Sequence, residues 1–396
     1  MGHSNKASIS RKPHPDFPLT PRADGRWAKK VRGKVYIFAG TTDEALAEWL
    51  RVKDDLLAGR TPRLKGDGLT VEDLCDHFLN AKRHLVETGE ITARTYADYF
   101  STCERLVKSF GLTRLVDDLR ADDFEALRAS IAKTRGPVSL GNEIGRVRVV
   151  LKYGFDADLI DKPVRAGPMF KPPSRKVLRK TRAAKGQRMI EAADLRRLLA
   201  VAGVPLKSMI LLAMNGGLGN SDIGNLPLSA IDLQRGWINF PRPKTGIARR
   251  FPLWPETIEA LKASLAGRPE PNDVEFKGLA FVTKYGQPWA KDGVVSVDED
   301  GAHKVNGRSA NPISAEFRKL LNALNLHRPG LGFYTLRHVF ETIAGESRDQ
   351  VAVDHVIGHA RDDMASTYRE RISDERLAAV VEHVRGWLFT KADDVL

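Results

Sequence analysis

The chain has 396 residues, enough for two or three domains, and a formal net charge of +13. With 42% hydrophobic and 29% charged residues, its composition is ordinary for a soluble globular protein. It shows no signal-peptide-like segment and no apolar run near ~18 residues, so we expect it to be neither secreted nor membrane-spanning. The only cysteines, Cys75 and Cys103, are too few for a disulfide framework or a cysteine-based zinc site. The sequence pI of 9.7 and the clustering of the basic residues favour a polyanionic partner.

The N-terminal part is expected to form a small β-sheet followed by a helix. Residues 1–13 are polar and basic, which predicts a disordered tail. Residues 17–40 contain three strand-like runs separated by Asp-Gly and Arg-Gly turns, and a helix capped by Thr42 follows. Lys29 and Lys30 would give this sheet a basic surface suited to phosphate contacts. A sheet that merely packs on its neighbour is an equally good interpretation.

The next part reads as a helical domain. Residues 60–68 form a linker rich in turn-forming and basic residues. Apolar residues then recur at helical spacing, and the short connections predict a compact four-helix domain. Arg146 lies on a partly basic face of the fourth helix. The predicted helices span residues 70–87, 92–110, 121–133 and 137–154.

A strongly basic segment follows this domain. Nine basic residues and no acidic one occur between Arg165 and Arg188, and prolines break any helix early in the stretch. Such a run is usually a solvated tail. Because it separates two predicted domains, we favour a linker that contacts the polyanionic partner. Its candidate contact residues are Arg175, Lys176, Arg179, Lys180 and Arg182.

The C-terminal part mixes helices with short strands. Lys244 lies in a turn between two β-like runs, residues 279–286 read as a strand, and residues 287–312 read as a polar loop or flexible hairpin. The last predicted helix, 374–388, has an amphipathic stripe that would pack either on its own domain or on a second copy. The other predicted helices span residues 191–203, 206–214, 255–266 and 313–324.

Two short motifs near the C-terminus carry the strongest functional signal. They are TLRHVFET at 335–342 and IGHARDDMASTY at 357–368. A phenol is a poor nucleophile at neutral pH, and its attack on a phosphodiester needs fixed cations to offset the negative charge. Arg337, His359 and Tyr368 would supply a guanidinium that matches phosphate oxygens, an imidazole and a phenol.

On these motifs the chain resembles the tyrosine recombinase (phage integrase) family. Members carry an arginine in a T-G-x-R-x-x-E-like box, a β-hairpin lysine, H-x-x-R, and L-G-H followed by a nucleophilic tyrosine. The resemblance implies that Arg337 is the second family arginine, His359 the late histidine and Tyr368 the nucleophile. It also implies that Lys244 protonates the leaving 5′-oxygen and that Tyr334 replaces the first histidine of H-x-x-R.

The chain departs from the family pattern in the first box, which reads GGLGNSDIGN at 216–225. When Asp222 is aligned with the acidic residue of the family, Gly219 stands where the first arginine belongs. Losing one fixed donor to a developing phosphorane costs about 2.7–4 kcal/mol. Three hairpin residues are candidates for a substitute arginine, and Gly219 has a second interpretation as a turn residue with positive φ. The candidates are Arg242, Arg249 and Arg250.

The resemblance implies a mainly α fold with small β-sheets (α+β), built from four parts. They are an arm-binding-like tail, sheet and helix (1–60), a helical core-binding domain (69–164), a basic linker (165–188) and an integrase-type catalytic domain (189–396).

The implied function is cleavage and rejoining of duplex DNA through a 3′-phosphotyrosyl link, without a metal or other cofactor. The expected partners are double-stranded DNA and further copies of the chain, as a dimer or tetramer on DNA that assembles through helix 374–388. The expected location is the cytoplasm, in association with the nucleoid. Because of Gly219, a cleavage-deficient homologue that binds or bridges DNA is the main alternative. A type IB topoisomerase-like enzyme is less favoured, because the front half resembles arm- and core-binding domains.

Overall fold

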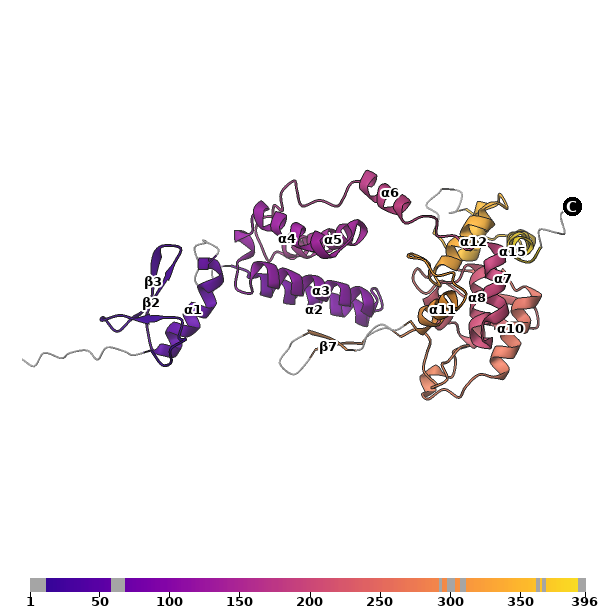
Figure 1. Ribbon diagram of the computed structural model, residues 1–396, viewed down its shortest axis with the longest axis horizontal. Helices are drawn as coiled ribbons and strands as arrows, with labels where there is room; N and C mark the ends of the chain where they lie inside the picture. The colour runs from indigo at the N-terminus through magenta and orange to yellow at the C-terminus, as the bar shows by residue number, and fades with distance from the viewer. Residues whose placement is uncertain are drawn as a thin grey trace, which may run out of the picture. The chain divides into compact units, whose positions relative to one another are not determined.

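The computed structural model describes residues 12–57, 68–291, 294–297, 303–306, 311–360, 364 and 368–390. Contacts divide the chain into a first unit (Met1–Thr181 with Val294–Asn306) and a second unit (Arg182–Gly293 with Gly307–Leu396). The described residues form helices and three small antiparallel sheets (Figure 1), which confirms the predicted mainly helical α+β class. The predicted disordered tail and the 60–68 linker lie almost wholly outside the described residues.

The N-terminal sheet and helix were predicted correctly. The strands β1 (Thr20–Pro21), β2 (Trp27–Val31) and β3 (Lys34–Phe38) pair in sequence order, and helix α1 (Thr42–Leu57) follows. Arg32 and Gly33 both have positive φ, at 48° and 84°, as a tight hairpin turn requires. The helix is capped one residue earlier than predicted, because the Thr41 hydroxyl accepts the Glu44 amide and the Glu44 carboxylate accepts the Thr41 amide.

The four helices of the first unit lie close to their predicted positions. Thr70 and Asp73 form a capping box, and Thr92 caps the second helix by accepting the Thr95 amide. Pro137 starts the fourth helix, where a missing amide proton has no cost. The helices enclose one apolar core. They are α2 (Val71–Glu87), α3 (Ala93–Phe110), α4 (Ala121–Thr134) and α5 (Pro137–Asp156).

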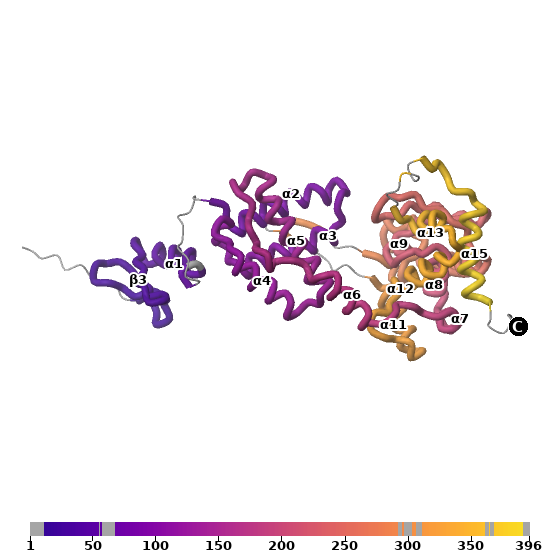
Figure 2. Tube along the Cα trace, turned by 90° about the horizontal axis from the view of Figure 1, so that it is seen from above, coloured from indigo at the N-terminus to yellow at the C-terminus, as the bar shows by residue number. Residues whose placement is uncertain are grey.

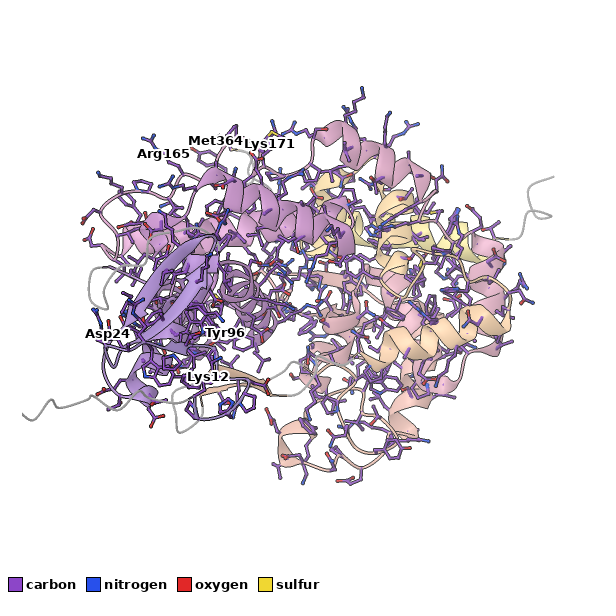
Figure 3. The ribbon with its side chains drawn as sticks, turned by 60° about the vertical axis from the view of Figure 1, so that its left-hand side comes forward. Lys12, Asp24, Tyr96, Arg165, Lys171 and Met364 are labelled. Carbon is purple, nitrogen blue, oxygen red and sulfur yellow. The ribbon has the colours of Figure 1, made fainter. Side chains whose placement is uncertain are left out.

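A hairpin from late in the sequence completes this core. Its strands are β7 (Val294–Val297) and β8 (His303–Asn306). Val295 and Val305 pack against the helical core, and the buried Tyr96 hydroxyl lies 2.7 Å from Nδ1 of His303 (Tyr96 is labelled in Figure 3). Burial raises the pKa of Tyr96 to about 12 and lowers that of His303. The sequence indicated a loop or hairpin here but not that it belongs to the first unit.

The basic segment contains a helix that the sequence did not predict. Helix α6 spans Arg175–Ala184 and has no buried residue. None of the five basic residues proposed as DNA contacts makes an ion pair within the described part of the chain. The helix therefore presents a continuous array of solvated cations.

The second unit packs its helices around α8, which is buried from Ser208 to Gly216. Figures 1 and 2 show α12 and α15 beside this helix. The strand predicted at 279–286 is wrong, because these residues form only isolated bridges, Pro227 to Leu279 and Val282 to Pro288. The helices are α7 (Ala192–Val201), α8 (Val204–Gly216), α9 (Asn220–Gly224), α10 (Pro255–Ala266), α11 (Pro312–Ala323), α12 (Thr335–Gly345), α13 (Gln350–Ile357) and α15 (Asp374–Phe389). The strands are β4 (Ile231–Asp232), β5 (Trp237–Asn239) and β6 (Arg250–Pro252).

Helix α15 buries its amphipathic stripe within the second unit. The indole Nε1 of Trp254 donates to the carbonyl of Val381 at 3.0 Å, which fixes the helix against its neighbours. A contact between this stripe and a second copy would therefore require the helix to leave its own unit. The buried residues of the stripe are Leu377, Val380, Val381, Val384 and Leu388. Among the described helices, none is both long and apolar enough to cross a membrane.

Candidate active site

Arg337 lies at the centre of the candidate site, on the buried face of α12. Its Nη1 donates to the carbonyl of Gly217 at 2.6 Å and its Nη2 to the carbonyl of Ile357 at 2.8 Å. These two bonds fix the guanidinium between the turn after α8 and the end of α13. Burial, and then the nearby charge of Arg242, lower the pKa of Arg337. A guanidinium still stays protonated at physiological pH, so the site holds a buried cation.

The short helix α9, which follows the turn after α8, carries the carboxylate that faces this cation. Gly217 ends α8 with φ of 63°, and Asp222 Oδ2 accepts the amide of Gly219 at 2.9 Å. Gly219 has φ of −85°, so the interpretation of Gly219 as a positive-φ turn residue is wrong, and Gly217 has that role. A Cβ at Gly219 would lie 3.2 Å from Cε2 of Tyr334. A side chain there needs a small movement of the Tyr334 ring but no backbone strain.

Arg249 brings a second buried guanidinium to the same carboxylate. The residue is 0% exposed, and its Nη1 donates to Asp222 Oδ2 at 3.1 Å while Nε donates to the carbonyl of Phe240 at 3.0 Å. Nη1 of Arg337 lies 3.9 Å from the same Asp222 oxygen. Nη2 of Arg249 is buried and has no hydrogen-bond partner among the described residues. An unpaired buried donor of this kind is costly unless a ligand accepts from it.

The other two candidate arginines lie in different surroundings. Arg250 makes a two-pronged ion pair with Asp374 and stacks on Trp237, with its guanidinium carbon 3.9 Å from the ring centre. Arg242 donates from Nη1 to the carbonyl of Gly358 at 3.3 Å, immediately before His359. Arg250 therefore joins β6 to α15, whereas Arg242 and Arg249 both lie close to Arg337.

His359 faces two carboxylates that the sequence analysis did not identify. Its Nδ1 lies 3.7 Å from Oε2 of Glu341 and 3.9 Å from Oδ1 of Asp354. Burial lowers the pKa of His359, Arg337 and Arg242 lower it further, and Asp354 opposes them. Glu341 follows Arg337 by one helical turn, a spacing that could have placed it on the same face. Among the described residues, the side chains of Glu341, Asp354 and His359 form a group that could bind a metal ion, because their ligand atoms lie within 4.8 Å of one another.

The remaining candidate catalytic residues are exposed. Lys244 lies in the turn between β5 and β6, where the amides of Thr245 and Gly246 donate to the carbonyl of Arg242. Tyr334 precedes α12 and packs edge-to-face against the ring of His338. Tyr368 is 76% exposed. Its neighbours 365–367 lie outside the described residues, and no described hydrogen bond joins it to Arg337 or His359.

The candidate DNA-binding residues outside α6 differ in their surroundings. Lys29 and Lys30 are adjacent on β2 and so point to opposite faces of the sheet. The amino group of Lys29 lies 5.5 Å from the ring centre of Trp49, while Lys30 is exposed. Arg146 donates to the buried carboxylate of Glu143 at 2.9 Å, so it already belongs to an internal ion-pair network.

Comparison with known proteins relates this site to one family. Residues 181–374 match the model of the phage integrase family. No curated protein matches the chain. Three solved structures with a similar fold are a lambda integrase tetramer bound to a Holliday junction, a lambda integrase dimer bound to a COC′ core site, and the Tn1549 transposon integrase in complex with a circular intermediate DNA.

The structural matches span most of the chain at low identity. The lambda integrase tetramer has a TM-score of 0.55 and 16% identity, over 91% of this chain and 98% of that one. The dimer has a TM-score of 0.53 and 16% identity, over 92% and 97%. The Tn1549 integrase has a TM-score of 0.55 and 15% identity, over 79% and 99%. These similarities show that the described residues have the fold of lambda integrase.

Proposed function

We propose that this chain, whose residues 181–374 match the model of the phage integrase family, is a site-specific DNA recombinase that cleaves and rejoins duplex DNA. One observation carries the proposal above the others. Two buried guanidinium groups, from Arg337 and Arg249, meet at the carboxylate of Asp222, close to His359 and to the hairpin that carries Lys244. Fixed cations preorganised in a buried site suit the charge that develops on a phosphodiester during attack.

In the proposed reaction the Tyr368 oxygen attacks the scissile phosphorus and gives up its proton to water, to which the exposed side chain has access. The new bond joins this oxygen to the 3′-side phosphate, and the bond to the 5′-oxygen breaks. Lys244 donates a proton to that leaving oxygen, which gives a free 5′-hydroxyl. Arg337 and His359 hold the non-bridging oxygens, and Tyr334 donates a further hydrogen bond. The phosphotyrosyl link conserves the energy of the broken ester, so the reaction needs neither a nucleotide nor an obligatory metal.

We propose that Arg249 substitutes for the first family arginine, whose position is occupied by Gly219 in this chain. Its buried Nη2 has no acceptor among the described residues, and its Nη1 shares the Asp222 carboxylate with Arg337. Arg250 is less suitable, because its guanidinium is occupied by Asp374. Arg242 lies beside Gly358 and His359, where it adds charge to the other side of the site.

The alternative function is DNA binding or bridging without cleavage. It is favoured by Gly219 and by the exposure of Tyr368. The test is to incubate the full chain with nicked suicide duplexes that contain its own recombination site, from which the fragment bearing the 5′-hydroxyl diffuses away. A covalent protein–DNA adduct resistant to denaturation is the result we expect. Tight duplex binding without an adduct on any such duplex would favour the binding protein.

We further propose that the chain acts in the cytoplasm, in association with the nucleoid, as a dimer or tetramer on DNA. The lambda integrase structures contain a dimer on a core site and a tetramer on a Holliday junction, which supports this expectation. Helix 374–388 is the proposed contact between copies, and release of its buried stripe would have to accompany assembly.

DNA binding should be steeply salt-dependent, because phosphate contacts would dominate it. For about six to ten neutralised phosphates, affinity should fall roughly 10³–10⁵-fold between about 50 and 200 mM salt. Replacing Arg175, Lys176, Arg179 and Lys180 with glutamine should reduce the slope of log affinity against log salt by about 3.6. Fluorescence anisotropy with a labelled duplex at several salt concentrations measures this slope.

A matched variant controls for the loss of net charge. It replaces four exposed basic residues that each have an acidic partner within one helical turn or tight turn, and its salt slope should hardly change. An equal reduction in both variants would show that α6 acts only through the overall charge. The four control residues are Lys152, Arg197, Arg235 and Lys319.

A further inference from the structure

Three arginines surround one buried carboxylate in the first unit. Glu143, on α5, is 1% exposed. Its Oε1 accepts a hydrogen bond from Nη1 of Arg105 on α3, and its Oε2 accepts one from Nη2 of Arg146 at 2.9 Å. Nη1 of Arg135, at the end of α4, lies 3.9 Å from the same Oε2. A single carboxylate therefore faces guanidinium groups from α3, α5 and the end of α4.

The charges of this cluster do not balance. Nη1 of Arg146 lies 3.6 Å from Oδ2 of Asp98, so Asp98 compensates Arg146 and Glu143 compensates Arg105. The charge of Arg135 then remains uncompensated. Its side chain is 35% exposed and makes no hydrogen bond with the described part of the chain. Nε and Nη2 of Arg105 likewise have no hydrogen-bond acceptor among the described residues.

This surplus of positive charge is not needed to bury the carboxylate. Taking a carboxylate out of water is costly unless a cation pairs with it, and one well-placed guanidinium meets that need. Further guanidinium groups around the same carboxylate repel one another. The arrangement therefore sacrifices folding stability, and binding of a polyanion at the surface would offset that loss.

We propose that Arg105 and Arg135 form a phosphate-binding site for duplex DNA on the first unit, and that Glu143 is the positioning residue that holds them. A guanidinium presents several donors in a fixed plane, which suits the oxygens of a phosphate. The buried carboxylate orients both groups without neutralising both, so a backbone phosphate completes the set. This inference rests on the proposed function, because that function supplies the duplex.

The first test is Arg135→Gln in the full chain, with binding followed by anisotropy of a labelled duplex of arbitrary sequence. The slope of log affinity against log salt should fall by about 0.9, the value for one neutralised phosphate. Affinity should then drop about 3.5-fold less than in the wild type between about 50 and 200 mM salt. The melting temperature should stay close to that of the wild type, because the side chain has no hydrogen bond to lose within the described residues.

Two further variants control for charge and for geometry. Lys152→Gln removes one exposed charge from α5, where Lys152 already pairs with Asp156, and should leave the slope unchanged. Arg135→Lys keeps the charge and should restore most of the slope. A slope for Arg135→Gln equal to that of the wild type would overturn the phosphate site.

The positioning role of Glu143 is tested by the sign of the effect of Glu143→Gln. Net charge alone predicts tighter DNA binding, because the variant loses a negative charge. Loss of positioning predicts weaker binding and a smaller salt slope. Because the change also removes a buried ion-pair partner, binding has to be measured below the melting transition of the variant. A folded Glu143→Gln protein that binds the duplex as tightly as the wild type, or more tightly, would overturn the positioning role.

These measurements separate the present proposal from the recombinase proposal. A wild-type chain that binds the duplex but forms no covalent adduct would contradict recombination, and the changes in salt slope would still support the phosphate site. Adduct formation together with an unchanged slope in Arg135→Gln would contradict only the phosphate site. A wild-type chain that binds no duplex at low salt would overturn both.

Discussion

Tyr368→Phe should abolish the covalent DNA adduct and leave non-covalent binding close to that of the wild type. The substitution removes only the phenol oxygen, which is the atom that would bond to phosphorus. Because the side chain is 76% exposed, its loss should hardly change packing or the melting temperature. Denaturing gels of protein incubated with nicked suicide duplexes measure the adduct, and anisotropy measures the binding.

Another exposed tyrosine of the second unit provides the control. Tyr285 is 72% exposed, so Tyr285→Phe removes a comparable hydroxyl at a position with no proposed role. It should form the adduct at the wild-type rate. An adduct that persists in Tyr368→Phe and maps by peptide sequencing to another residue would overturn the nucleophile assignment.

Arg249→Ala should lower the cleavage rate by about 10²–10³-fold, a factor similar to that for Arg337→Ala. Its guanidinium would be the second fixed cation next to the phosphate. The change also breaks a buried ion pair with Asp222, which can cost about 3–5 kcal/mol of folding free energy. Cleavage therefore has to be compared at a temperature where melting curves show each variant to be folded. Arg250→Ala is the control, and it should affect stability more than the chemical step.

A second variant, in which the arginine is moved from position 249 to position 219, separates an effect on cleavage from an effect on folding stability. In Gly219→Arg with Arg249→Ala, the cation returns to the position that the family box would give it, and Asp222 Oδ2, which lies 3.6 Å from the Cβ position of residue 219, loses its Arg249 partner and can pair with the new arginine. Since Gly219 has an ordinary negative φ, the backbone should tolerate the change. We expect the double variant to cleave faster than Arg249→Ala alone. A cleavage rate equal to that of the wild type in a folded Arg249→Ala protein would contradict the hypothesis that Arg249 is the substitute arginine.

Much of the fold followed from local signals in the sequence. The predicted helix starts at residues 70, 92 and 137 agree with the observed starts to within one residue, where Thr70, Thr92 and Pro137 act on the first turn. Helix α6 was missed, because the prolines before it and its many basic residues indicated a linker. The strand expected at 279–286 was wrong for a different reason. Its apolar residues are buried in the core of the second unit without pairing along a sheet.

The residue types of the site could be predicted from the sequence, but the contacts between its side chains could not. The sequence named Arg242, Arg249 and Arg250 without a way to choose among them. Arg249 contacts Asp222 whereas Arg250 contacts Asp374, and both contacts depend on tertiary structure. Glu341 was within reach of helical spacing from Arg337. Asp354 was not, because only the packing of α13 against α12 brings it to His359.

The hairpin formed by β7 and β8 limits how this protein can be divided into fragments that fold. A recombinant fragment that ends at Thr181 contains every helix of the first core but lacks Val295, Val305 and His303. The hydroxyl of Tyr96 would then lose its only described partner, and apolar surface would face water. A chimaera that exchanges the first unit between related chains therefore has to carry residues 294–306 along with the N-terminal half. The segment that has to be kept together in such an exchange is therefore made of two stretches that are far apart in the sequence.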